Sequence, residues 1–340
     1  MLVTRKGEII LIEIKNLTKR YGAHAAVDGL TFTVEKGEIC GLLGPNGAGK
    51  STTMNMITGY ISATDGTASV DGLDIFDEPQ KARAKIGYLP EIPPLYTDMT
   101  PYEYLIFVAE LKGVKRAERH DEVERVMEKT GVSDVAERLI KNLSKGYRQR
   151  VGFAGALVGN PEVIILDEPT VGLDPKQIIE MRELIKTLAS DHTVLLSSHI
   201  MQEISAVCDK VVIISKGKLV AYDTPENLSA DTQRKRTLKV TALDTQGEVN
   251  SVLKQLKDVE NIELLPCEEE GAVTAEITTT EDKDLRAEVS SALSKAGCAV
   301  LSMKTEVLSL EDVFLALTSE NQPEASEEIQ GEKQEEEAQK

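Results

Sequence analysis

The sequence predicts an α/β protein in two folded parts. Over residues 11–225, short apolar runs typical of strands alternate with helical segments, which indicates a mostly parallel sheet. A block of helical periodicity at about 98–158 is inserted into this alternation. Beyond a polar stretch at 224–236, which we interpret as a linker, the order strand, helix, strand, strand, helix, strand predicts a small ferredoxin-like α+β unit.

The first elements are mainly strands. "LIEIKNLTKRYG" and "LTFTVEKGEICGLLG" show the alternation and short apolar runs of strands, with Gly37 between two of them. "STTMNMITG" predicts a helix closed by Gly59, and "GTASVDGLDI" predicts a strand pair around the turn Asp71-Gly72.

The inserted block begins at a helix start signal. Thr100 and Glu103 have capping-box spacing, with Pro101 at the first helical position. Helical periodicity continues through "DEVERVMEKTG" and "VAERLI", and another helix is expected from Ser144 to about residues 159–161. The alternation then resumes with the strand "EVIILDEP", the helix "KQIIEMRELIKTLAS", the strand "HTVLLSSH" and two strands in "CDKVVIISKGKLVAYD".

The ferredoxin-like unit is expected over 237–318, where "SLEDVFLALTS" predicts a closing helix. Residues 319–340 contain eight Glu against two Lys and almost no apolar residue, so we expect a disordered acidic tail.

Composition narrows the classes of function. The 340-residue chain has a formal net charge of −18, so nucleic acid is not expected as a partner. No apolar run reaches the ~18–20 residues that a transmembrane helix needs, and no secretion signal is visible. Its four Cys are scattered without metal-ligand spacing, which fits a reducing cytosolic compartment.

The stretch "LLGPNGAGKSTT" contains the motif G-x-x-x-x-G-K-S. Its members are Gly44, Gly49, Lys50 and Ser51. In this motif the backbone N–H groups of a glycine-rich loop cradle phosphates, the lysine reaches the outer phosphates, and the hydroxyl can hold Mg²⁺. Many unrelated NTPases carry the loop, so it predicts nucleotide binding without identifying the work done.

The apolar strand in "VIILDEPT" ends in two carboxylates. Asp167 can hold Mg²⁺ through water opposite Ser51, and Glu168 can polarise a water molecule for attack on the γ-phosphate.

A second anion site is predicted at "LSKGYRQRV". Ser144 is a natural N-cap, and the helix that it opens presents N–H groups and the positive end of its dipole. Because the site lies about a hundred residues beyond the phosphate loop, it has no evident purpose within one monomer. Placed against the ATP of another copy, it would complete a γ-phosphate pocket.

In this order, the motifs resemble those of an ATP-binding-cassette (ABC) ATPase. They are the phosphate loop, "LSKGYRQ", "VIILDEPT", "GLD" at 172–174 and "SSH" at 197–199. The resemblance covers roughly 11–225 and implies a P-loop NTPase cassette with an inserted helical subdomain. The chain is similar to the cytoplasmic ATPase subunit of an ABC transporter, and its C-terminal unit resembles the extension of drug-export and gliding-type subunits.

The resemblance implies roles for individual residues. Tyr21 would stack on adenine, His199 would contact the γ-phosphate and support the attacking water, and Asp174 would link two sites. Ser144 and Gly146 would contact ATP bound to the partner subunit. Phosphates and Mg²⁺ would be held by Gly44, Asn46, Gly47, Gly49, Lys50, Ser51 and Thr52.

Two positions depart from the family pattern. Glu91 stands where Gln is common, and its carboxylate can still ligate Mg²⁺ while adding negative charge near the γ-phosphate. Lys145 replaces a usual Gly of the signature, where its charge could reach phosphate or face solvent.

The implied function is that of a transport motor. Two cassettes would clamp two ATP molecules head to tail, and the helical block would carry the motion to a separate membrane-spanning permease, with export as the expected direction. The partners are that permease and a second copy or a homologous ATPase, and the chain would lie at the inner face of the cell membrane. The alternative is a soluble ABC ATPase that acts on ribosomes or DNA, although fused cassettes or long coiled coils typical of those types are missing. A GTPase is disfavoured because the chain has no N-K-x-D motif.

Overall fold

The computed structural model describes residues 2–3, 9–232, 237–244, 247–267, 269, 271–279 and 284–306. The chain divides into two compact units, Met1–Pro225 and Glu226–Lys340. The expected closing helix at 309–319 and the acidic tail at 319–340 lie outside the described residues. No helix among the described residues is long and apolar enough to cross a membrane.

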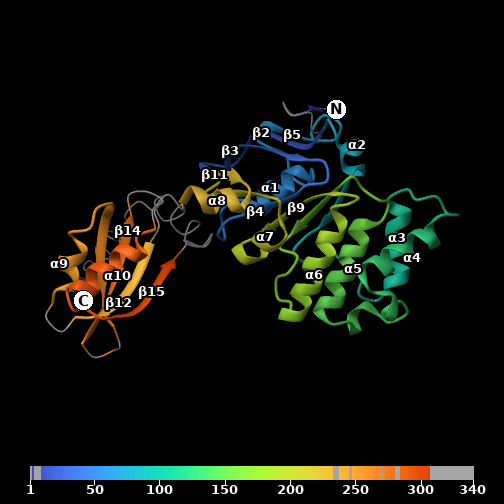
Figure 1. Ribbon diagram of the computed structural model, residues 1–340. Helices are drawn as coiled ribbons and strands as arrows, with labels where there is room; N and C mark the ends of the chain where they lie inside the picture. The colour runs from blue at the N-terminus through green and yellow to red at the C-terminus, as the bar shows by residue number, and fades with distance from the viewer. Residues whose placement is uncertain are drawn as a thin grey trace, which may run out of the picture. The chain divides into compact units, whose positions relative to one another are not determined.

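The first unit is built on a six-stranded sheet in the order β11-β10-β4-β9-β8-β7. Figure 1 labels β4, β9 and β11 of this sheet. Its strands are β4 (Ile39–Leu43), β7 (Ile86–Leu89), β8 (Val163–Asp167), β9 (Thr193–Ser198), β10 (Lys210–Ser215) and β11 (Lys218–Asp223). All neighbours are parallel except β10 and β11, so the predicted mostly parallel sheet is confirmed. The carboxyl ends of β4, β8 and β9 therefore meet at one edge of the sheet.

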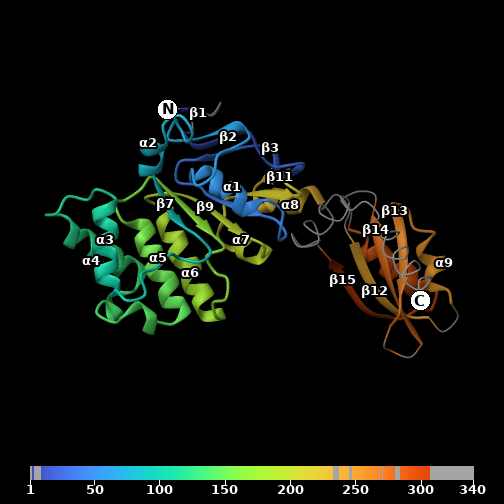
Figure 2. The same cartoon turned by 180° about the vertical axis from the view of Figure 1, so that it is seen from behind.

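The N-terminal strands form a separate antiparallel sheet rather than extending the parallel one. It contains β1 (Leu2–Val3), β2 (Ile9–Tyr21), β3 (His24–Glu35), β5 (Asp65–Val70) and β6 (Leu73–Asp74). Helix α1 (Lys50–Ile57) contacts β3 and β5 of this sheet and β8 of the parallel sheet, so it lies between them (Figure 2). The sheets and α1 share one buried apolar core.

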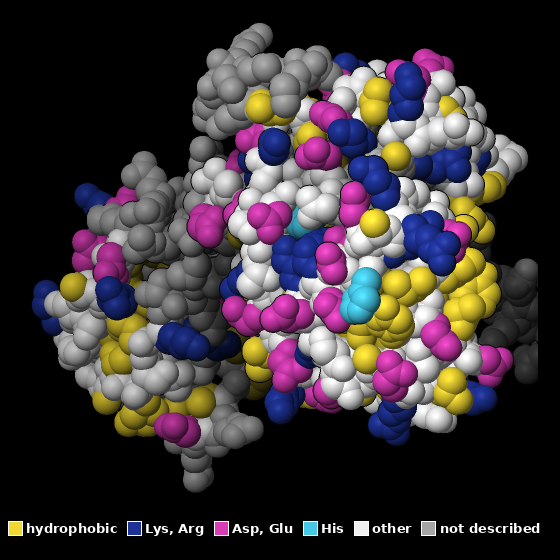
Figure 3. Space-filling view, turned by 90° about the vertical axis from the view of Figure 1, so that its right-hand side faces the viewer, with side chains coloured by type: hydrophobic (Ala, Val, Ile, Leu, Met, Phe, Trp, Pro, Cys, Tyr) yellow, Lys and Arg dark blue, Asp and Glu magenta, His cyan; other side chains and the backbone are white. Residues whose placement is uncertain are grey.

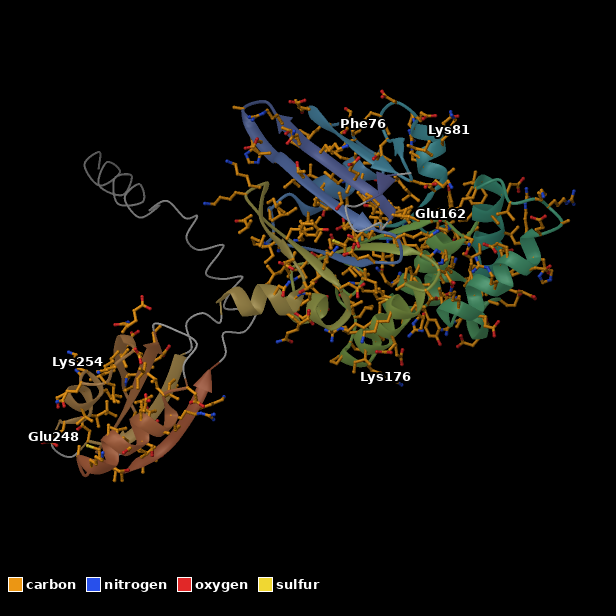
Figure 4. All side chains as sticks on the ribbon, turned by 45° about the horizontal axis from the view of Figure 1, so that its top comes forward. Phe76, Lys81, Glu162, Lys176, Glu248 and Lys254 are labelled. Atoms are coloured by element: carbon orange, nitrogen blue, oxygen red, sulfur yellow. The ribbon has the colours of Figure 1, made fainter. Side chains whose placement is uncertain are left out.

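Strand β4 shows how the parallel sheet is covered on both faces. Cys40 and Leu42 point into the core shared with α1. Gly41 faces the other way, where a Cβ would lie 2.8 Å from the Ile204 side chain of α7 (Met201–Val207). Helix α6 (Pro175–Leu188) contacts β9 and α7. The short helix α2 (Pro79–Ala84) lies near the antiparallel sheet, with Phe76 partly buried against the core and Lys81 exposed (Figure 4).

The helical block consists of α3 (Pro101–Leu111), α4 (Arg119–Thr130) and α5 (Lys145–Leu157). The predicted capping box is confirmed: Glu103 N donates to Thr100 Oγ1 at 3.2 Å, and Thr100 N donates to Glu103 Oε2 at 2.9 Å. The prediction of a helix at "VAERLI" is wrong. The segment instead joins the 3₁₀ turns Ser133–Val135 and Ile140–Asn142, because its backbone bonds to the residues before and inside α3, as when Ile140 N donates to Met99 O at 2.9 Å.

The C-terminal end of α5 is closed by the side chain of Lys112. Lys112 follows α3, and its Nζ donates to the carbonyl oxygens of Gly155, Ala156 and Val158 at 3.0, 2.9 and 2.8 Å. Burial lowers the pKa of this ammonium to about 8, against an opposing effect of Glu122. The ammonium thus satisfies carbonyls that have no partner within the helix.

We expect Lys112→Met to destabilise the protein by about 1–3 kcal/mol, because buried carbonyls lose their donor. Thermal unfolding measures this, with Lys115→Met as the control because the Lys115 side chain is 81% exposed. The folded-state pKa of Lys112 lies near 8 and its ordinary value is 10.5, so the unfolded chain binds more protons between these pH values. The wild type should gain stability over Lys112→Met as pH rises through this window. A difference in unfolding free energy between the wild type and Lys112→Met that becomes smaller as pH rises would contradict this account.

The second unit forms the antiparallel sheet β13-β14-β12-β15. Its elements are β12 (Thr237–Leu243), α9 (Val249–Leu253), β13 (Val259–Leu265), β14 (Ala272–Thr279), α10 (Arg286–Lys295) and β15 (Val300–Glu306). Both helices pack through Val249, Leu253, Val289 and Leu293 against Val240 and Ile277 of the sheet. This strand order is that of a ferredoxin-like unit, as predicted. The predicted linker at 224–236 is corrected in part, because residues Pro225–Thr232 form α8.

Candidate active site

The phosphate loop joins the end of β4 to the start of α1, and two of its glycines are required by space. A Cβ at Gly44 would lie 2.5 Å from Ile214 O. Gly49 has a φ of 102°, and a Cβ there would lie 2.5 Å from Ala26 O. The loop backbone therefore packs closely against Ile214 and Ala26. The loop leads directly into the N-terminus of α1, whose first N–H groups have no partner within the helix.

The loop borders a cavity of about 350 Å³. The cavity brings together residues from distant parts of the chain, namely Ala26, Asn46, Gly47, Gly49, Lys50, Ser51, Thr52, Glu91, Glu168, Val171 and His199. Most of the residues predicted to hold nucleotide or Mg²⁺ thus surround one space, and Glu91 is among them.

Lys50 lies on the wall of this cavity and is 6% exposed. Its Nζ donates to Gly44 O at 2.7 Å and to Pro45 O at 3.3 Å, and it lies 3.4 Å from Glu168 Oε1. The ammonium is fixed by these contacts at the cavity, where a phosphate group would meet both its charge and the positive end of α1.

The two carboxylates at the end of β8 point to different partners. Asp167 Oδ1 accepts from Ser51 Oγ at 3.3 Å and from Ser197 Oγ at 2.6 Å. Glu168 Oε2 lies 2.9 Å from His199 Nδ1, and Glu168 is 7% exposed. Asp167 is thereby held by Ser197 of β9, and Glu168 is held by His199, the residue that follows β9.

The residues around Ser51 suit a magnesium ion. Its hydroxyl and the Asp167 carboxylate lie side by side, and Glu91 adds a second carboxylate to the cavity. Oxygen ligands of this kind, completed by water and substrate phosphates, are what Mg²⁺ prefers.

Six predicted site residues do not line this cavity, namely Tyr21, Gly44, Ser144, Gly146, Asp167 and Asp174. Tyr21, the last residue of β2, is 55% exposed, and Lys19 Nζ lies 5.3 Å from its ring centroid. Ser144, Gly146 and Asp174 form a second group at the N-termini of α5 and α6. Gly44 packs against Ile214 and Ala48, and Asp167 reaches the cavity through its bond to Ser51.

The second group links two helix N-caps. Ser144 Oγ accepts from Tyr147 N at 3.3 Å, and Asp174 Oδ1 accepts from Gln177 N at 2.9 Å. A Cβ at Gly146 would lie 2.5 Å from Gln177 Oε1, so the two helix starts touch. Ser144 is exposed, so the N-terminal end of α5 is open to a ligand or partner.

Lys145 turns toward this junction. Its Nζ would lie 2.0 Å from a Cβ at Gly172, so the ammonium sits over the glycine of the "GLD" segment. Gly172 also has a φ of 71°, a backbone conformation that favours glycine.

Sequence reasoning missed four polar residues beside the site, namely Thr170, Ser197, Ser198 and Glu203. Ser197 Oγ accepts from Glu168 N at 2.9 Å in addition to its bond to Asp167. Glu203 accepts from Thr170 and Ser198. Ser197 and Ser198 lie in the "SSH" stretch, where only His199 was given a role, and the adjacency of β8 and β9 was the signal that could have identified them.

Comparisons with known proteins agree on one family. Residues 27–171 match the family model described as "ABC transporter". The chain is 32% identical over 312 residues to the linearmycin resistance ATP-binding protein LnrL of Bacillus subtilis, covering 91% of this chain and 98% of that protein. It is 38% identical over 258 residues to the bacitracin transport ATP-binding protein BcrA of Bacillus licheniformis, covering 75% and 82%.

A solved structure shares the fold of the first unit. It is a dimeric ATP-binding cassette, MJ0796, in a post-hydrolysis state bound to ADP and Pi. The TM-score is 0.58 at 26% identity, and the match covers 63% of this chain and 98% of that one.

Proposed function

The chain belongs to the family of ABC transporter ATP-binding subunits, which are ATPases that bind ATP with Mg²⁺, and on this premise we propose that it drives export through a separate membrane-spanning permease. The observation that carries the proposal is the convergence of Lys50, Glu168 and His199 on one cavity. We assign the nucleotide machinery to residues 11–225 and treat 237–318 as a separate unit.

In the proposed reaction, Lys50 and the loop N–H groups bind the phosphates of ATP. Glu168 accepts a proton from the attacking water, while His199 orients the Glu168 carboxylate and contacts the γ-phosphate. Ser51, Asp167 and Glu91 are the proposed ligands of Mg²⁺, which supplies charge neutralisation when bound. The remaining loop residues Asn46, Gly47, Gly49 and Thr52 hold phosphates, and Tyr21 provides a stacking surface for adenine.

The second group serves a partner subunit in this proposal. Ser144 and Gly146 contact the ATP of the other copy, and Asp174 links the two sites across the dimer. Support comes from the position of this group outside the phosphate-loop cavity and from the open N-terminal end of α5. The dimeric state described for the similar MJ0796 cassette supports the same arrangement.

A groove beside the cavity supports the permease proposal. It has a volume of about 450 Å³ and runs between the 91–97 segment and the first turns of α5. Glu91 borders both the groove and the cavity, so a change in the residues around the nucleotide can be passed through Glu91 to the groove. Ile92 lines the groove and is 81% exposed, and Tyr96, next in the chain to its lining residues, is 54% exposed. Hydrophobic side chains also gather over part of the face seen in Figure 3. Exposed apolar surface of this kind is typical of a protein interface.

Export is the proposed direction because of the relatives. One is described as a resistance protein and another as a bacitracin transport protein. The alignment with the resistance protein covers 91% of this chain, and that with the bacitracin transport protein covers 75%. Both alignments are longer than the nucleotide cassette at 11–225.

The permease proposal is tested by purifying the full chain with its associated membrane proteins from its own host and reconstituting them in vesicles. We expect a multispanning protein to co-purify, ATP-dependent substrate movement, and at least about 10-fold weaker association for Ile92→Glu, because a charge enters an apolar contact. Tyr60→Glu is the matched control, since Tyr60 is 80% exposed outside the groove. ATP hydrolysis without any permease association, or equal loss in both variants, would contradict the assignment.

A further inference from the structure

A buried carboxylate lies behind the site and has no part in the chemistry proposed above. Glu203 stands in the first turn of α7 and is 6% exposed. Its Oε2 accepts from Thr170 Oγ1 at 2.5 Å and from Ser198 Oγ at 2.9 Å. Thr170 and Ser198 are themselves 5% and 1% exposed, so the two hydroxyl groups depend on protein acceptors rather than on bulk water.

The two hydroxyl groups belong to the segments that carry the catalytic pair. Thr170 comes two residues after Glu168, and Ser198 directly precedes His199. Glu168 and His199 meet on the other side through the 2.9 Å contact between Oε2 and Nδ1. One carboxylate oxygen of Glu203 therefore ties together the backbones from which both side chains reach the cavity.

The backbone of Glu168 explains why such a tie is needed. Its φ is 47°, in the left-handed region, which is strained for a residue with a side chain. A conformation of this kind persists only when its surroundings hold it. Ser197 Oγ holds the N–H of Glu168 at 2.9 Å on one side, and the Thr170–Glu203 bond anchors the chain on the other.

The Thr170–Glu203 bond also bears on the segment that leads to Asp174, the residue proposed to link the two sites of the dimer. Leu173 N donates to Thr170 O at 3.2 Å, which closes the turn that leads to Asp174. A displacement of Thr170 would reach both Glu168 and this turn.

We propose that Glu203 is a positioning residue for ATP hydrolysis, which holds Glu168 and His199 in register through Thr170 and Ser198. The inference rests on the proposed roles of Glu168 and His199. It assigns Glu203 no contact with ATP. Loss of Glu203 should therefore slow turnover and leave nucleotide binding at the phosphate loop unchanged.

The test compares Glu203→Leu, which removes the acceptor, with Glu203→Gln, whose amide oxygen can still accept from hydroxyl groups. We expect Glu203→Leu to lower kcat by roughly 10- to 100-fold, since small misplacements of catalytic groups have effects of this size. KM for ATP and the equilibrium Kd of ATP should stay within about two-fold. Glu203→Gln should restore kcat to within about three-fold of the wild type. Ser205→Ala, on the exposed side of α7, is the control.

A second set of variants tests the route through the hydroxyl groups and does not depend on Glu203→Leu folding. Thr170→Val should lower kcat, whereas Thr170→Ser, which keeps the hydroxyl, should not. If Glu203 acts through Thr170 and Ser198, Thr170→Val combined with Ser198→Ala should lower kcat as far as Glu203→Leu does, and adding Glu203→Leu should lower it no further.

The outcomes separate this inference from the proposed function. A wild type that hydrolyses no ATP defeats the proposed function itself. An active wild type with unchanged kcat in folded Glu203→Leu, or in the Thr170→Val and Ser198→Ala pair, overturns the positioning role. A Glu203→Gln variant as slow as Glu203→Leu overturns the acceptor account. A loss confined to thermal stability would mean that Glu203 only supports the fold.

Discussion

Replacing Glu168 by Gln should leave ATP binding intact and lower turnover by about 10²–10⁴-fold, the usual loss when a positioned general base is removed. Glu168 directly follows the buried strand β8, is 7% exposed, and keeps its carboxylate between Lys50 and His199. Gln preserves the shape and a hydrogen-bonding oxygen but cannot take a proton from water at neutral pH. The variant should consequently accumulate with ATP bound, as a dimer held closed.

Phosphate release measures the turnover, ATP titration measures binding, and size-exclusion chromatography with and without ATP measures the dimer. Glu183→Gln is the matched control, because it makes the same change on an exposed face of α6. Hydrolysis at the wild-type rate in Glu168→Gln would remove Glu168 from the mechanism. Loss of ATP binding together with turnover would indicate a structural role instead.

The parts of the site that could be predicted are those encoded within one short segment. The phosphate loop depends on glycines where a Cβ would strike Ile214 O or Ala26 O, and such positions are visible as Gly44 and Gly49. The N-caps at Thr100 and Ser144 likewise depend on residues three apart in the chain. Local geometry of this kind is set by residue type and spacing.

The parts that could not be predicted depend on contacts between distant segments. Ser197 of β9 bonds to Asp167 and Glu168 at the end of β8, and Glu203 of α7 bonds to Thr170, with each pair about 30 residues apart in the chain. Glu203 lies on α7, a seven-residue helix too short to give a periodic signal. The 3₁₀ turns at "VAERLI" have the same explanation, because bonds to the segment before α3 outweigh local helical periodicity.

Replacing Ser144 by Arg should spare ATP binding by the monomer and abolish ATP-dependent dimer closure and hydrolysis. Ser144 is exposed at the N-terminus of α5, and its hydroxyl caps Tyr147 N. In the proposed dimer this end of α5 meets the γ-phosphate bound to the partner's phosphate loop, so a bulky side chain blocks the approach. The cap itself is worth about 1 kcal/mol, so Ser144→Asp, which keeps the cap but adds repulsion toward phosphate, should fold and still be inactive. Ser144→Thr, which keeps the cap without charge, is the control.

The sharper experiment mixes two inactive variants, Lys50→Ala and Ser144→Arg. A mixed dimer keeps one intact composite site, formed by the phosphate loop of the Ser144→Arg chain and the α5 N-terminus of the Lys50→Ala chain. If one working site suffices, activity should return to about a quarter of the wild-type level, because random pairing makes about half of the dimers mixed and each has one of two sites. Lys50→Ala mixed with a chain carrying both substitutions is the control, and it should stay inactive because neither of its composite sites is complete. Since Lys50 and Ser144 lie in separate groups within one chain, a site confined to the monomer could not be rescued in this way. Normal hydrolysis by Ser144→Arg alone, or no recovery on mixing although mixed dimers form, would count against a shared site and against ATP-dependent closure as the source of the transport stroke.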